Sequence, residues 1–366
     1  MQRYLTLASA GCLVASMSHA GGIDRSGQSI APLFETGGES GSYAELSFGS
    51  VYPDVTGSAL GADSGNLTEN YLRFGAAYKT DINDRISLAL IFDQPYGADV
   101  SYPTGTGYVF GGSTAEFESN AITGILRYKF DGGFSVHAGL RAQAISADVA
   151  IPYFAGYTAS SPTDTSFGYL VGAAYEKPEI ALRVALTYFS KVKHDTEVTE
   201  YTALTGTSTS PTSLETPEAI NFDFQTGIAA DTLLFGGVRW VNWADFTITP
   251  PVYENLLGTP IVYYNGNYTT YTVGVGRKFN DTWSGSVALT YEPAVGGYTT
   301  NLGPHDGLFG VTVGVKYTRD RFSVSGGVNL AWIGDAETVV SRTPFATSSF
   351  DNNTAIGAGI KIGYNF

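Results

Sequence analysis

Hydrophobic and polar residues alternate with a period of two along most of the chain, from residue 43 to its last residue. The clearest case is the segment 308–318, in which every second residue is apolar: Phe309, Val311, Val313, Val315 and Tyr317. Successive side chains of a β-strand point to opposite faces, so the pattern predicts a strand with one apolar face. Its two terminal aromatic residues should lie roughly 20 Å apart along the normal of a membrane, close to the height of a lipid-facing band.

The same alternation recurs at 72–79, 122–130, 134–141, 180–188 and 321–332. We predict fourteen strands, near 42–54, 69–79, 85–97, 115–130, 134–148, 166–176, 179–192, 217–230, 232–247, 268–279, 283–293, 307–318, 321–334 and 354–366. Basic side chains of the amphipathic strands fall on the inward, polar register: Arg73, Arg127, Arg141, Arg183 and Lys316.

The connections between these strands alternate in length. Tight turns are predicted at 81–84, 131–133, 177–178, 231, 280–281 and 319–320. Long segments rich in Gly, Ser, Thr, Pro and Asn lie between them, near 55–68, 98–114, 149–165, 193–216, 248–267, 294–306 and 335–353. Short turns at one end and long loops at the other are typical of outer-membrane barrels. We therefore predict an all-β, transmembrane, antiparallel β-barrel of about fourteen strands.

The last strand also favours a barrel. Ile360, Ile362, Tyr364 and Phe366 alternate with small or polar residues, and the sequence given ends on Phe366. Such a terminal aromatic strand resembles the signal read by the barrel-assembly machinery. The alternative is an edge strand of a soluble sandwich, but a closed barrel removes the exposed edge.

The first twenty residues have the features of a cleavable signal peptide. Arg3 supplies a positive charge, an uncharged apolar run follows, and Ser18-His19-Ala20 forms a small-x-small cleavage signal. The single cysteine, Cys12, would be the lipidated residue of a lipoprotein, but the apolar run before it is short for that interpretation. We predict three parts: a signal peptide at 1–20, an N-terminal segment at 21–41 and the barrel at 42–366, located in the outer membrane.

Composition narrows the class of partner. The chain has 20 basic and 34 acidic residues, a net charge of −14, which argues against nucleic acid. Beyond residue 20, no uncharged apolar run approaches the ~20 residues of a membrane helix. Gly, Tyr and Phe are abundant, with 45, 24 and 21 copies, as expected for small lumen residues and aromatic girdles. We expect outer-membrane lipid and lipopolysaccharide around a monomeric barrel.

Seven short stretches are informative when taken together in chain order: Val51–Val55, Ile82–Asp84, Pro95–Ala98, Leu214–Glu218, Trp240–Phe246, Asn280–Trp283 and Gly303–Asp306. Together they resemble the FadL/TodX-type transporters of long-chain fatty acids and hydrocarbons. The resemblance extends from about residue 42 to the last residue and lies in the order and spacing of these pieces. It implies a fourteen-stranded barrel plugged by an N-terminal hatch, with a ligand pocket in the lumen and a lateral exit where strand three kinks.

Two regions carry the expected gating. Pro95, Tyr96 and Gly97 fall where the resemblance places the kink, and proline lacks the N–H that a β-ladder requires. The alternative is an ordinary strand end. The hatch, at 21–41, is short and lacks the Asn-Pro-Ala tripeptide often present in the family. Its nearest match is Ile30-Ala31-Pro32-Leu33-Phe34. A flexible leader to the barrel is the alternative for this segment.

The sequence shows little catalytic chemistry. His137, His194 and His305 fall on separate elements, and neither a zinc-protease nor a serine-hydrolase motif is present. We expect no enzyme activity, cofactor or metal site. Register and family position suggest lumen ligand contacts at these residues: Ile91, Phe92, Ile125, Leu170, Arg127, Arg141 and Arg183. An inward cation could attract a carboxylate, or it could form an ion pair within the barrel.

Three functions remain at this stage. The first is passive uptake of long-chain fatty acids or similar hydrophobic molecules, driven by the ligand's gradient and its preference for an apolar path. The second is a diffusion porin for small polar solutes, against which the strand number and the 15% charged content weigh. The third is a structural or adhesive barrel, which should have repetitive or unusually long loops.

Overall fold

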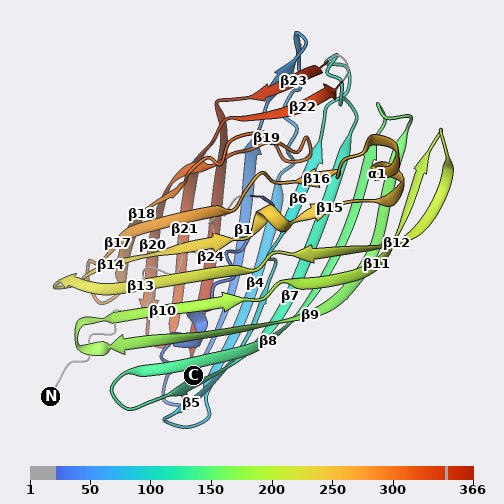
Figure 1. Ribbon diagram of the computed structural model, residues 1–366. Helices are drawn as coiled ribbons and strands as arrows, with labels where there is room; N and C mark the ends of the chain where they lie inside the picture. Colours follow the sequence, from blue (N-terminus) through green and yellow to red (C-terminus); the bar gives the residue numbers. More distant parts are fainter. Residues whose placement is uncertain (1–21, 343–344) are drawn as a thin grey trace.

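The computed structural model describes residues 22–342 and 345–366 and contains a closed barrel of fourteen antiparallel strands (Figure 1). The wall strands are β1 (Ser42–Asp54), β4 (Tyr71–Asp81), β5 (Ile86–Asp93), β7 (Thr114–Lys129), β8 (Phe134–Ile151), β9 (Tyr157–Lys177), β10 (Leu182–Phe189), β13 (Ala219–Ala229), β14 (Thr232–Val241), β17 (Tyr268–Lys278), β18 (Trp283–Glu292), β20 (Leu308–Arg319), β21 (Phe322–Ile333) and β24 (Asn353–Asn365). Each pairs with the next, and β1 pairs with both β4 and β24, which closes the wall.

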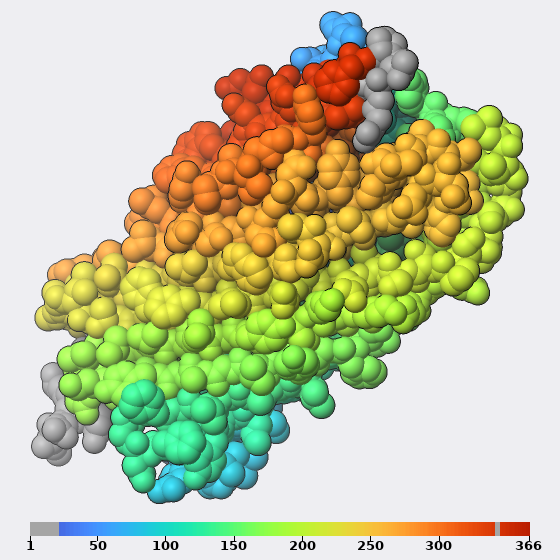
Figure 2. All heavy atoms as spheres, viewed as in Figure 1, coloured from blue at the N-terminus to red at the C-terminus, as the bar shows by residue number. Residues whose placement is uncertain are grey.

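The alternation predicted from the sequence sets the two faces of the wall. On β7, Ile122 and Leu126 are about half exposed, whereas Ile125 and Arg127 are buried. On β20, Val313 is exposed and Thr312 is buried. The apolar register thus faces outward and the polar register faces the lumen, which is the reverse of the arrangement in a soluble protein. Side chains close the spaces between β13, β14, β17 and β18 in the view of Figure 2.

Several predicted loops are in fact regular structure. Segment 193–216 forms the hairpin β11 (Val192–Thr202) and β12 (Gly206–Thr216), which continues the wall beyond β10. Segment 335–353 contains β22 (Ala336–Arg342) and β23 (Phe345–Phe350), and β8 and β9 extend into the predicted 149–165 loop. Alternating Thr and Ser residues continue these strands because cross-strand Thr and Ser side chains pair well.

The long-loop end carries the remaining small elements (Figure 1). They are β2 (Gly57–Ala59), β3 (Ala62–Asp63), β15 (Thr247–Ile248), β16 (Val262–Tyr263), β19 (Tyr298–Thr299), α1 (Pro251–Leu257) and η4 (Trp243–Asp245). Strands β19, β22, β23, β2 and β3 form one small sheet. No helix in the described part of the chain is long and apolar enough to cross a membrane.

The opposite, short-turn end has the tight connections predicted from the sequence. One of these connections is the helical turn η3 (Pro178–Ile180), so Ile180 lies in a turn and not in the strand predicted at 179–192. Gly133 adopts φ +89°, and a Cβ there would lie 2.2 Å from the Glu176 carbonyl oxygen. Both the conformation and the space at this turn therefore require glycine.

Candidate functional site

The wall is interrupted between β4 and β5. Their pairing runs from Asp81↔Ser87 to Ala76↔Phe92 and then stops. Strand β5 ends at Asp93, and after Gln94-Pro95-Tyr96 the chain forms β6 (Gly97–Ser101), which pairs with β7. The strand predicted at 85–97 thus corresponds to β5, and β6 lies mostly in the segment predicted as a loop at 98–114. Of the predicted kink residues, Pro95 and Tyr96 lie in the break, where proline cannot donate to the ladder, and Gly97 is the first residue of β6.

Side chains bridge this break in place of the backbone ladder. The Phe74 N–H donates to Gln94 Oε1 at 2.8 Å, and Gln94 Nε2 donates to Asn120 Oδ1 at 3.4 Å. Backbone bonds across these strands resume at Glu69 N to Asp99 O, 3.1 Å. A single flexible side chain therefore links the strands where backbone hydrogen bonds close the rest of the wall.

Aromatic rings border the break on its outer side. The ring centroids of Phe48 and Phe74 are 5.2 Å apart, and those of Phe74 and Phe92 are 5.6 Å apart. Phe92 shares the outward register of Leu88 and Leu90, so its predicted place in the lumen was wrong. The reason is the β-strand period: Ile91 points inward, so its neighbour points out.

Residues 23–25 of the chain fill the inner side of the break. Arg25 N donates to Pro95 O at 2.7 Å, and Gly97 N donates to Ile23 O at 2.9 Å, forming a short antiparallel bridge. This satisfies backbone groups that the kink removes from the ladder.

The Arg25 side chain holds this bridge against the wall. Its guanidinium lies 2.5 Å from Asp99 Oδ2 and 3.9 Å from the centre of the Tyr71 ring. A Cβ on Gly97 would lie 2.5 Å from the Arg25 guanidinium carbon, so glycine makes room for it. Arg25 thus joins the N-terminal segment (residues 22–41) to β4 and β6 at the break.

The neighbouring side chain, Asp24, reaches the other side of the barrel. It accepts hydrogen bonds from Arg239 Nε at 2.7 Å and pairs with Arg239 Nη2 at 2.5 Å, with side-chain exposures of 0% and 7%. Arg239 Nη1 donates to Asn221 Oδ1, and Asn221 Nδ2 donates to Gly27 O, both at 2.8 Å. Asp24, which forms an antiparallel bridge with Tyr96, and its neighbour Arg25 therefore contact opposite sides of the barrel.

The predicted hatch residues lie further along this segment. Ala31–Phe34 form the 3₁₀ turn η2, with Leu33 fully buried, and Ile30 precedes it. The Phe34 ring lies 4.5 Å from the Arg127 guanidinium carbon and 4.9 Å from that of Arg183. Two cation–π contacts therefore hold the end of the turn between β7 and β10.

Internal pairing accounts for two of the three arginines predicted as ligand contacts. Arg127 donates to Glu176 and to Ser135, and Arg141 pairs with Asp93 at 3.3 Å. Arg183 instead contacts Phe34. The ion-pair alternative weighed from the sequence thus describes Arg127 and Arg141.

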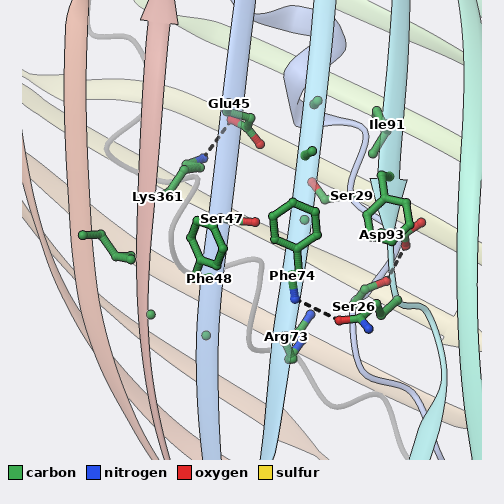
Figure 3. Close-up of a pocket in the computed structure, with 18 of the residues that line it drawn as sticks. Ser26, Ser29, Glu45, Ser47, Phe48, Arg73, Phe74, Ile91, Asp93 and Lys361 are labelled. Carbon is green, nitrogen blue, oxygen red and sulfur yellow. Dashed lines mark hydrogen bonds and ion pairs between the residues drawn. The ribbon is translucent and has the colours of Figure 1, made fainter.

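Two cavities lie beside the N-terminal segment: Arg25 lines the first, and Ser26 lines the second. The first, of about 890 Å³ and partly open to solvent, lies between β1, β6 and loop 302–308, and its lining is mainly apolar, with Val51, Val100 and Leu302. The second lies at the break, and its lining includes Ser26 on the inner side and the outer-face rings of Phe48 and Phe74 (Figure 3).

The predicted apolar contacts do not gather in one pocket. Ile91 lines the second cavity, and it also lines a smaller cavity together with Ile125, Arg141 and Ile30. Leu170 is 1% exposed and lines neither of these cavities. Sequence reasoning missed Asp24 and Arg25, although they are the only charged residues between 21 and 34.

The histidines lie apart. His137 contacts Thr187, His194 contacts Asp164, and His305 Nδ1 lies 3.0 Å from Gly303 O. Burial lowers the pKa of His305, in loop 303–306, below its ordinary value. Within residues 22–342 and 345–366, no group of three or more His, Cys, Asp or Glu side chains could hold a metal ion.

Neither a protein-family model nor a curated protein matches the sequence. Solved structures do. A Pseudomonas aeruginosa FadL homologue superposes with a TM-score of 0.75 at 17% identity, covering 92% of both chains. The chain has the FadL/TodX-type fold. The toluene transporters TbuX of Ralstonia pickettii and TodX of P. putida each give a TM-score of 0.63 at 12% identity, covering 92% of this chain and 91% of theirs. The FadL/TodX resemblance inferred from the sequence is thereby confirmed for the fold.

Proposed function

We propose that this barrel takes up hydrophobic molecules passively, through an apolar cavity in the lumen and a lateral exit at the break between β4 and β5. The observation that carries the proposal is the second cavity, whose lining combines Ser26 on the lumen side with Phe48 and Phe74 on the outer face. A hydrophobic molecule that reaches it can enter the membrane without crossing water.

The change of polarity along the lumen supports a lateral route. Toward the long-loop end, Val55, Val100, Tyr102, Phe117 and Leu302 belong to one apolar cluster. Toward the short turns, the inward face carries ionic groups, including Lys79, Asp81 and Lys129. An apolar solute gains nothing by continuing into this charged half, so the break is its favourable way out.

The fold neighbours support the same class of cargo. They are a FadL homologue and two toluene transporters. By analogy, fatty acids and aromatic hydrocarbons are the ligand classes to test here.

We further propose that residues 22–41 act as the hatch. Contacts of Asp24, Arg25 and Phe34 with different sides of the barrel argue for a plug and against a flexible leader. They also argue against the diffusion-porin alternative, because these residues bridge the lumen that a polar solute would cross.

The setting of the barrel follows from the same proposal. We place it in the outer membrane as a monomer among lipid and lipopolysaccharide. The C-terminal strand, whose Phe366 ring lies 4.9 Å from the Tyr364 ring, would be read by the barrel-assembly machinery. The expected signal peptide lies outside the described residues.

A reversible disulfide tests the exit. Extending the β4–β5 register two residues beyond Ala76↔Phe92 would place Phe74 opposite Gln94, and the Phe74 N–H already contacts the Gln94 side chain at 2.8 Å. We therefore expect a Phe74→Cys/Gln94→Cys pair to form a bond across the break, and the rest of the chain after Cys12 contains no cysteine. We expect oxidation to reduce uptake of labelled toluene and oleate, in cells lacking their own transporter, to the background, and reduction to restore it. Val313→Cys/Val328→Cys, which joins two paired wall strands, is the matched control. Undiminished uptake by the oxidised Phe74–Gln94 pair would exclude this exit.

A further inference from the structure

The charges around the two cavities suggest which hydrophobic molecules can pass. We propose that the Arg25–Asp99 ion pair makes this lumen selective for uncharged hydrophobic molecules over carboxylates of similar size. The inference rests on the proposed uptake function and adds the substrate class and the residues that set it.

Cations at these cavities are outnumbered by carboxylates. The two linings contain three cationic side chains, Arg25, Arg73 and Lys361, and five carboxylates, Asp24, Glu45, Glu69, Asp93 and Asp99. Behind the linings, Arg239 and Arg141 pair with Asp24 and Asp93. Even with these two included, positive charge does not exceed negative charge.

The ion pairs at these two cavities make the entry of an anion unfavourable. Lys361 Nζ lies 3.4 Å from Glu45 Oε2, drawn in Figure 3, and Arg25 lies 2.5 Å from Asp99. A carboxylate that enters the apolar cavity loses its hydration and must either remain without a counter-ion or separate a pair that already exists. An uncharged molecule of the same size meets neither cost.

The surroundings of Asp99 add to the barrier. Asp99, Glu69, Glu118 and Asp148 all lie close enough to Glu116 for their charges to repel it. This group of acids lies on and beside β6 and β7, next to the break. A carboxylate near Arg25 therefore meets repulsion from Asp99 itself, to which the exposed Glu116, Glu118 and Asp148 add a contribution that water screens.

Asp99 is the position at which this selectivity can be changed. Asp99→Asn keeps the shape and can still accept a hydrogen bond from Arg25, but it leaves the guanidinium charge without its carboxylate. The arginine then becomes a counter-ion for an incoming carboxylate on the floor of the apolar cavity. Removing the cation as well, in Arg25→Gln/Asp99→Asn, should cancel that gain.

The test compares dodecanol with dodecanoate at pH 7.5, as initial uptake rates above the background of cells without the protein. These probes share a twelve-carbon chain and differ in charge. For the wild type, we expect dodecanol to enter at least about tenfold faster than dodecanoate. We expect the dodecanoate-to-dodecanol ratio to rise at least about fivefold in Asp99→Asn and to return toward the wild-type ratio in the double variant. Asp195→Asn, at an exposed carboxylate on β11, is the matched control and should leave the ratio unchanged.

Each outcome has a defined meaning, provided that every variant runs as a folded, heat-modifiable barrel. Equal or faster entry of dodecanoate in the wild type overturns the selectivity but leaves the uptake function intact. A ratio that does not change in Asp99→Asn removes the Arg25–Asp99 pair as its cause. Failure of both probes to enter through the wild type overturns the uptake function itself, and this inference with it.

Discussion

Removal of the Asp24 carboxylate should release the N-terminal segment from the wall. In Asp24→Ala, the Arg239 guanidinium, whose side chain is only 7% exposed, loses its buried partner. Breaking a buried pair by deleting one member costs about 3–5 kcal/mol. At about 1.4 kcal/mol per factor of ten, the detached population of the segment should rise by roughly two to three and a half orders of magnitude.

Two measurements report that detachment. Limited proteolysis of the folded barrel should cleave within residues 22–41 much faster in Asp24→Ala, and ion conductance in planar bilayers should increase as the lumen opens. The double variant Asp24→Leu/Arg239→Met removes both charges and should recover most of the protection, because apolar replacement of a whole buried pair is often tolerated. If the single and double variants are equally sensitive to protease, an unpaired arginine is not the cause and the reasoning fails.

Two further predictions concern the ends of the barrel. Gly133→Ala should lower the free energy of unfolding by roughly 2 kcal/mol or more, because the positive φ and the 2.2 Å approach to the Glu176 carbonyl oxygen both oppose a Cβ. Urea unfolding, followed by the heat-modifiable shift in gel mobility, measures this loss. Gly124→Ala is the control, because a Cβ there would have no atom within 4 Å. Loop 303–306 should open more readily as the pH falls below about 6.5, because the folded-state pKa of His305 lies below its unfolded value and the unfolded loop binds the proton first. Proteolysis of the loop at pH 7.5 and pH 5 tests this, and His305→Gln should abolish the pH dependence.

The wall strands were predictable because the pattern that forms them lies within each short segment of sequence. The period-two pattern specifies which face of each strand meets lipid, and tight-turn residues such as Asp231 and Asp320, both at positive φ, mark the short connections. The prediction that segments 193–216 and 335–353 are loops was wrong for a related reason. Their strands carry Thr and Ser on both faces, so no hydrophobic pattern reports them.

The interior was less predictable because its contacts join distant parts of the chain. Proline at position 95 suggested a break, but nothing local indicates that Ile23 and Arg25 supply the missing backbone partners, or that Asp24 reaches Arg239, 215 residues away. Phe92 was misplaced for a simpler reason: adjacent residues of one strand cannot both face the lumen.

The seam of the barrel has a consequence for biogenesis. Strand β1 pairs with β24 from Tyr43↔Asn365 to Asp54↔Thr354, so closure joins residues about 300 positions apart in sequence. Such non-local pairing forms late and slowly, because the entropy of closing so long a chain opposes it. A chain interrupted anywhere before β24 would keep two unsatisfied strand edges and remain an open sheet. We therefore expect this barrel to close only after all of its wall strands, including β24, have been synthesised.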